Sequence, residues 1–151
     1  STRYQGYYMA DKDYARTVDL AVTVKNMNQQ PVTFDLEHYF IAKTANGKLK
    51  WSYDGGTQTL MLAKAAHTNM TITSKELQSS KTESYYYKTE TGSKYEGYIF
   101  RALVAGKVVQ VNASSRQFET VARNEKELES LIEAAEEGRK QVRDASIGIM
   151  R

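Results

Sequence analysis

The sequence predicts one mostly-β domain, an antiparallel sandwich with a C-terminal helical segment packed on it. Short apolar runs that alternate with polar residues recur at close spacing up to position 113, and turn-forming residues separate them. After position 113 the apolar residues change to a helical spacing. The chain has 151 residues, 40% hydrophobic and 26% charged, which suits a single globular domain with its own core.

The first part of the sandwich contains the strictest alternation. Residues 1–15 are rich in tyrosine and predict an N-terminal arm or edge strand ahead of a sandwich body over 16–113. Two strands follow, at 18–24 and 32–42, and Asn46-Gly47 is a strong signal for a hairpin turn after the second. The apolar faces of these strands are formed by Val18, Leu20, Val22, Val24, Phe34, Leu36, His38 and Phe40.

The middle of the body is more interrupted. Residues 54–56, Asp-Gly-Gly, predict a break between two short strands. Residues 69–74 alternate again, and the aromatic run within 83–89 predicts a further strand. Residues 90–93 predict a turn that leads into the last strand pair.

That last pair, residues 94–113, is the strongest hairpin and organises the sandwich. A two-residue turn at positions 105 and 106 would place Phe100 opposite Val111 on a buried face. Arg101 would then lie on a mixed face. The pattern therefore predicts that Phe100 matters much more to stability than Arg101 does.

A helical segment over 114–138 follows the hairpin. Ser114 and Gln117 have the spacing of a capping box, and a bend or a second helix start is expected near Asn124. The apolar stripe ends at Gly138, so residues 139–151 are expected to form a loose tail. Because only one stripe is apolar, this segment should cover a face of the sandwich.

The sequence contains no motif that carries specific chemistry. Cysteine is absent, which removes disulfides and thiolate sites, and neither a nucleophile elbow nor a glycine-rich phosphate loop occurs. His38 and His67, the two histidines, fall in a strand and a loop without carboxylates at ligand spacing. We therefore expect no enzyme activity, no catalytic residues, no cofactor and no metal site.

Tyrosine is the most informative residue type, with 11 in the chain. Tyr85 and Tyr87 would share one face of a strand and, beside Lys88, form an exposed aromatic ladder. We predict a protein–protein contact there, between copies or with another protein. The simpler alternative is a solvated strand that uses tyrosine for its β-propensity.

Trp51 and Tyr53 offer an alternative function. They share one face of a strand and could form a platform on which a sugar stacks, although a tryptophan in such a strand is more often a core residue. Nucleic-acid binding is not expected, because the net charge is only +3 and the basic residues are scattered. Membrane insertion is not expected either, because no apolar run reaches the ~20 residues of a membrane span.

Three stretches together, Val18–Asn26, Phe34–Ala42 and Tyr95–Ala113, resemble immunoglobulin-like β-sandwich modules of the Gram-negative envelope, including pilus-associated or pilin-like surface proteins. The resemblance implies about seven or eight strands and a core role for Trp51, although the Cys…Trp…Cys hallmark is missing.

The function that this resemblance implies is that of a non-catalytic structural or binding module, secreted, periplasmic or at the cell surface. A leader would then lie upstream of Ser1. Such a module would act through its sheet edges and tyrosine-rich faces on a protein partner or on further copies of itself, as a homo-oligomer; a glycan is the alternative ligand.

Overall fold

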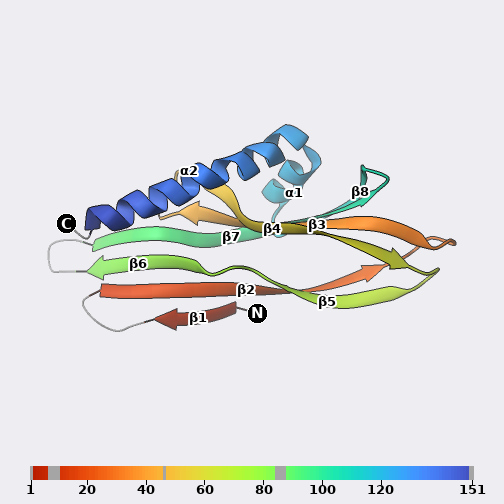
Figure 1. Cartoon of the computed structure of the whole chain (residues 1–151), viewed down its shortest axis with the longest axis horizontal. Coiled ribbons are helices and arrows are strands. Elements are labelled where there is room, and N and C mark those ends of the chain that lie inside the picture. The colour runs from red at the N-terminus through yellow and green to blue at the C-terminus, as the bar shows by residue number, and fades with distance from the viewer. Residues whose placement is uncertain (1, 7–10, 46, 84–87, 150–151) are drawn as a thin grey trace.

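The computed structural model shows an elongated molecule in which helices and two strand layers are stacked (Figure 1). The structure describes the backbone at residues 2–6, 11–45, 47–83 and 88–149 and the side chains at residues 16–45, 47–77 and 92–142.

The described strands form two layers that face each other. One layer contains β1 (Thr2–Gly6), β2 (Asp11–Lys25), β5 (His67–Thr73) and β6 (Leu77–Glu83). The other contains β3 (Val32–Thr44), β4 (Lys50–Leu62), β7 (Lys88–Val104) and β8 (Lys107–Ala113). All pairings are antiparallel, and β6 joins the layers by pairing with β7 at one end. The predicted fold class, a mostly-β sandwich with a C-terminal helical segment, is confirmed.

Two helices cover the outer face of the second layer. Helix α1 (Arg116–Arg123) starts at Ser115, whose side chain accepts a hydrogen bond from the Phe118 amide, so the predicted cap at Ser114 is wrong by one residue. The predicted second start at Asn124 is confirmed, because its side-chain oxygen accepts hydrogen bonds from the first amides of α2 (Glu125–Ile149).

Helix α2 passes through Gly138 without ending there. The predicted stop and loose tail are therefore wrong. Gly138 is buried, and a β-carbon built on it would lie 2.3 Å from an indole carbon of Trp51. The glycine allows the helix to approach the tryptophan closely, which is a packing role rather than a capping role.

The hairpin of β7 and β8 has the predicted turn but a different register. Ala105 and Gly106 both have positive φ, as a primed two-residue turn requires. A bulge between Ala102 and Leu103 then shifts the pairing, so that Phe100 lies opposite Asn112 rather than Val111. Both faces of β7 are buried near this point, Phe100 against the other layer and Ile99 against the helices.

Arg101 is buried beneath the helices, which corrects its predicted minor role. Its side chain is 4% exposed and forms ion pairs of 3.1 Å with Glu37 on β3 and 2.7 Å with Glu125 at the start of α2. The Tyr39 hydroxyl donates a 3.0 Å hydrogen bond to the same Glu37 carboxylate. Burial, reinforced by that carboxylate, raises the pKa of Tyr39 to about 12.

Strand β4 runs straight through the predicted break. Gly55 and Gly56 lie beside β3, where a β-carbon on Gly55 would be 2.8 Å from the carbonyl oxygen of His38. The glycine pair thus allows close strand pairing instead of ending a strand. The predicted turn at 90–93 is also wrong, because these residues belong to β7 and pair with β6 or β3.

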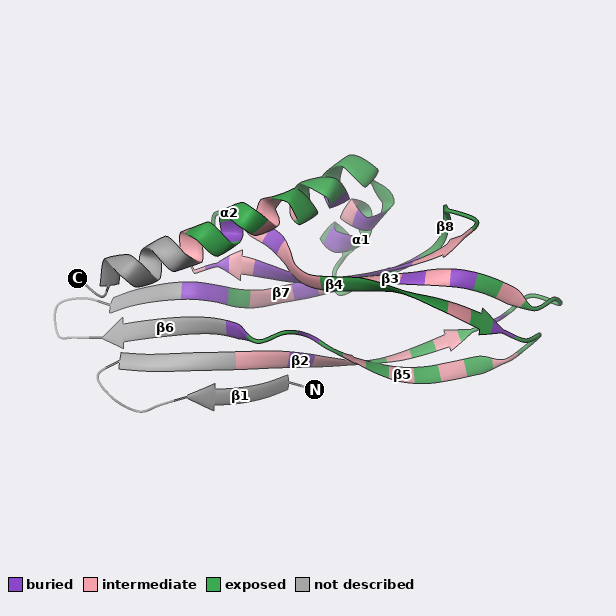
Figure 2. Cartoon of the chain, viewed as in Figure 1, coloured by how far each residue is buried: buried purple, intermediate pink, exposed green. Residues whose placement is uncertain are grey.

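Among the described side chains the buried residues form three clusters, and Figure 2 colours the buried segments purple. The first lies between the layers and contains Phe34, Leu36, Leu62 and Phe100, in line with the predicted faces. The second lies under α1 and the start of α2, around Ile41, Ile99 and Phe118. The third joins Trp51 and Leu77 to apolar residues of α2.

Candidate functional site

The candidate site is an open cleft between the two layers, at the end of the molecule away from the β6–β7 pairing. There β2 pairs with β5 instead of β6, and β7 pairs with β8, so no strand joins the layers on that side among the described residues. The cleft has a volume of about 590 Å³. This is within the size range of sites that bind small molecules or peptide side chains.

The walls of the cleft combine apolar and polar surface in about equal parts. All residues of β2 from Leu20 to Lys25 belong to the lining, and among them Leu20, Val22 and Val24 are half-buried while the residues between them are exposed. The apolar lining consists of Leu20, Ala21, Val22, Val24, Met27, Val32, Phe34, Leu36, Tyr98, Phe100, Ala102, Val104 and Val109. An apolar surface that stays partly open to water is typical of a contact site.

Two carboxamides stand at the rim on β8. The bulge in the hairpin turns Gln110 and Asn112 toward the cleft side, opposite Ala102 and Phe100, and leaves Val109 59% exposed. Among the described residues neither carboxamide has a hydrogen-bond partner. The sequence pattern predicted that Val109 and Val111 lie opposite Ala102 and Phe100, with Gln110 and Asn112 on the other face. It contained no signal for the bulge.

Among the described strands, none pairs with the edge of β2 opposite β5 over Asp19–Lys25. β1 covers this edge only from Tyr14 to Val18, and β5 pairs with the other edge of Asp19–Lys25. The Val18 amide donates a 3.0 Å hydrogen bond to Ser74, on the β5 side. Because backbone groups alternate along a strand, those of Ala21, Thr23 and Lys25 point to the open edge.

His38 lies close behind the cleft, on the inner face of β3. Its ring centroid is 5.7 Å from that of Phe40 and 6.3 Å from that of Phe100. Burial lowers the pKa of His38 below its usual 6.5, and the nearby carboxylate of Asp54 opposes this only in part. The neutral imidazole is therefore a packing group in the apolar layer, and it lies outside the cleft lining.

The lowered pKa makes stability depend on pH. The unfolded chain binds the His38 proton more readily than the folded chain does. The contribution of neutral His38 to the free energy of unfolding is therefore complete above about pH 6.5 and is lost as pH falls toward the lower folded pKa. We expect His38→Gln to flatten the decrease in unfolding free energy over this interval in urea titrations. His67→Gln, at an exposed site, should leave the decrease intact. Parallel curves for wild type and His38→Gln would contradict this prediction.

The residues predicted to contact a partner are only partly described. Tyr85 and Tyr87 lie outside the described residues, and only the backbone of Lys88 is described, at the start of β7. Glu83 of β6 and Lys88 are antiparallel partners, so the predicted single strand over 83–89 is wrong. The contact predicted at these residues stays a prediction.

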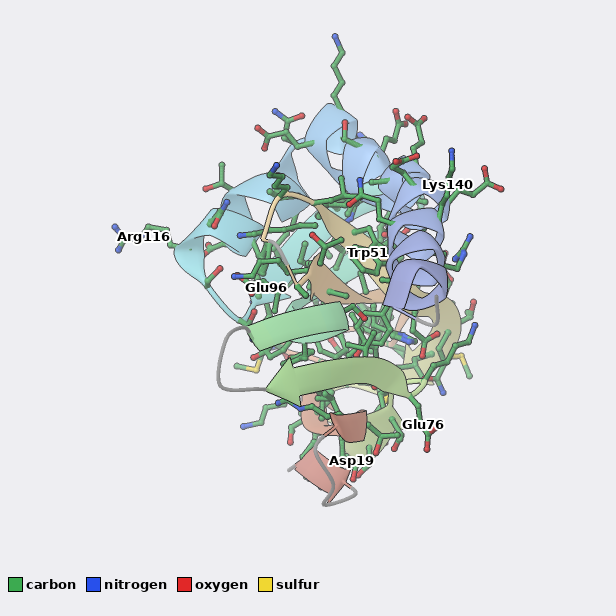
Figure 3. All side chains as sticks on the ribbon, turned by 90° about the vertical axis from the view of Figure 1, so that its left-hand side faces the viewer. Asp19, Trp51, Glu76, Glu96, Arg116 and Lys140 are labelled. Carbon is green, nitrogen blue, oxygen red and sulfur yellow. The ribbon has the colours of Figure 1, made fainter. Side chains whose placement is uncertain are left out.

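Trp51 and Tyr53 do not form an open platform for a sugar. Trp51 is 2% exposed and lies beneath α2, as Figure 3 shows. Tyr53 is half-buried in the same core region, and burial raises the pKa of its hydroxyl. In this structure Trp51 has the core role that the sequence resemblance implies.

The described ranges, residues 16–45, 47–77 and 92–142 for side chains, show neither a metal cluster nor a membrane-spanning helix. No group of three or more histidine, aspartate or glutamate side chains is placed there to hold a metal ion. No helix in the described part of the chain has the length and apolar composition to cross a membrane.

Comparisons with known proteins show similarity at the level of structure alone. No family model matches the sequence, and no curated protein matches it. Among solved structures, a β-glucuronidase from glycoside hydrolase family 2 is similar with a TM-score of 0.36 and 7% identity over 75% of this chain and 10% of that chain.

Two further solved structures show a similar likeness. A putative β-galactosidase from Bacteroides fragilis has a TM-score of 0.33 and 14% identity over 75% of this chain and 15% of that chain. A β-glucuronidase 2 from Bacteroides uniformis has a TM-score of 0.35 and 8% identity over 74% and 12% of the two chains. This chain thus spans only a small part of the length of each of these enzymes.

Proposed function

We propose that this chain is a non-catalytic binding module that contacts a protein partner at the open end of its sandwich. The observation that carries the proposal is the cleft of about 590 Å³ between the two layers, which is lined by apolar side chains and by hydrogen-bonding side chains. Such a lining suits a polypeptide segment, because the apolar part can take its side chains and the carboxamides can bond its backbone.

The chemistry of the lining supports this choice of ligand. Leu20, Val22 and Phe100 offer apolar contact, while Gln110 and Asn112 can each both donate and accept hydrogen bonds. A peptide backbone presents exactly such donors and acceptors. No carboxylate or imidazole belongs to the described lining, which favours binding over acid–base catalysis at this cleft.

We also propose a place for the module in the bacterial envelope or at the cell surface, in the manner of the pilus-associated proteins that the sequence resembles. This part of the proposal depends on the resemblance of three strand regions to envelope modules and on no feature of the cleft. Cell fractionation with an antibody against the chain tests it, and recovery in the cytosolic fraction alone would contradict it.

The cleft is tested with peptides selected from a displayed random library against the purified chain. We expect selected peptides to bind the wild type and to lose about tenfold or more in affinity to Ala102→Trp, because the indole would fill the space that the peptide side chains need. Leu103→Trp is the matched control, since it puts the same side chain on the opposite face of β7.

Circular dichroism of both variants checks that they are folded. Peptides that bind all three proteins equally would place the contact elsewhere. A selection that returns no specific peptide would contradict a polypeptide ligand for the cleft.

A further inference from the structure

We propose that the polypeptide segment bound by the cleft is acidic, and that one of its carboxylate groups binds at a basic notch beside the cleft opening. The notch has a volume of about 350 Å³ and is lined by residues 25–29 and by Lys64, Ala65 and His67. The inference rests on the proposed function and names the chemistry of its partner.

The notch adjoins the cleft, because residues 25–28 line both spaces. These residues begin the connection from β2 to β3, at the end of the molecule away from the β6–β7 pairing (Figure 1). Met27, which is 85% exposed, belongs to the shared rim and offers a flexible apolar contact there. A segment that leaves the cleft over this rim therefore passes the notch.

Asn26 joins the two loops that form the notch. It is buried, and its side-chain amide donates hydrogen bonds within its own loop and across to the connection from β4 to β5. The acceptors are the carbonyl oxygens of Gln30, Leu62 and Ala63, at 2.9, 3.1 and 3.0 Å. These bonds fix one loop against the other, so Lys25 and Lys64 line the same notch although they are far apart in sequence.

The ionisable groups of the notch and the cleft are all basic. Lys25 of β2 and His67 of β5 are direct cross-strand partners, so their side chains project from the same face of the layer. Lys64 is exposed, as Lys25 is, and neither lysine has an ion pair among the described residues. The described lining of the two spaces contains no aspartate or glutamate. A carboxylate from the partner is the electrostatic complement of this surface, and ammonium and imidazole groups can donate hydrogen bonds to it.

The same features favour a polypeptide over a nucleic acid as the source of the negative charge. Nucleic-acid binding depends on many phosphate contacts, and the described lining of the notch offers two lysines. The cleft beside them is lined in part by aliphatic side chains such as Leu20 and Val22, which suit the apolar side chains of a peptide. An acidic residue next to apolar residues in one segment would occupy both spaces.

Two displayed libraries test the charge of the partner, one with all residue types and one without aspartate and glutamate. We expect the peptides selected from the first library to contain acidic residues beside apolar ones. At low salt they should bind the purified chain about tenfold or more tightly than the best peptides from the second, measured by fluorescence anisotropy. Added sodium chloride should remove most of this difference, because the lysines of the notch are exposed to solvent.

Charge reversal tests the notch itself. The double variant Lys25→Glu with Lys64→Glu should weaken the binding of the acidic peptides about tenfold or more. Lys126→Glu with Lys140→Glu is the matched control, since it changes the net charge equally at exposed positions of α2. Peptides in which lysine replaces the acidic residues should bind the notch variant more tightly than the wild type. Circular dichroism checks that both double variants are folded.

Two outcomes would overturn the inference and leave the proposed function intact, provided that the peptides still lose affinity to Ala102→Trp. One is equal affinity of the best peptides from the two libraries, and the other is equal binding of acidic peptides by the notch variant and the helix control. Random single-stranded DNA that binds the wild type more tightly than the acidic peptides, and the notch variant weakly, would also refute it. Failure of both selections would contradict the proposed function and the inference together.

Discussion

Arg101→Ala is expected to lower the free energy of unfolding by about 3–5 kcal/mol. The guanidinium is 4% exposed and bridges Glu37 of the sheet and Glu125 of the helix, at 3.1 Å and 2.7 Å. Its removal leaves the partly buried Glu37 carboxylate without its cation. It also leaves an empty space between β7 and the junction of α1 and α2, where Arg101 donates to the Ala122 carbonyl.

Urea denaturation compares this variant with Arg123→Ala. Arg123 pairs with Glu119 at a similar distance of 3.1 Å, but both side chains are about half exposed or more, at 60% and 49%. The loss of that pair should cost less than about 0.5 kcal/mol. If the two arginine variants were equally stable, the buried ion pairs would not hold the helices to the sheet.

Trp51→Ala is the second change with a large expected effect, about 3–5 kcal/mol of unfolding free energy. The indole is 2% exposed and fills the space between β4 and α2. Its loss leaves a cavity that the rigid helix and sheet can close only in part. Chemical denaturation followed by circular dichroism measures the loss.

The contact of Trp51 with Gly138 predicts a reversal of sign. In the wild type, Gly138→Ala should destabilise the fold by about 1–3 kcal/mol, because the added methyl group overlaps the indole. In the Trp51→Ala background the same change should stabilise the protein by up to about 1 kcal/mol, since alanine is the better helix former. Additive effects in this double-mutant cycle would show that helix and tryptophan do not touch.

Local pattern was enough to predict the type of most elements. The alternation of Val18 to Val24 marks a strand whose one face is buried, and the spacing of Phe118, Leu128 and Leu131 marks helices with one apolar stripe. Asn124 marks the junction of the two helices through its own side chain. These features depend on neighbours within a few residues, so they can be seen in the sequence.

The errors occurred where a distant contact decides the structure. Gly138 is a helix stop by local propensity, and Gly55-Gly56 a turn, yet each lies against a segment far away in sequence that leaves no room for a side chain. The same holds for Arg101, whose burial follows from Glu125 at the start of another element. The neighbouring sequence of a glycine or a charged residue is the same whether or not a distant segment packs against it.

The sequence by itself determined the fold class, the buried faces of the strands around Val18–Val24 and Phe34–Phe40, and the apolar stripe of the helices. Only the tertiary structure decided which side chains line the cleft. The bulge at Ala102 turned Gln110 and Asn112 toward it, against the facing that the local pattern predicts. Register and edge pairing depend on the balance of many long-range contacts, which no single stretch of sequence contains.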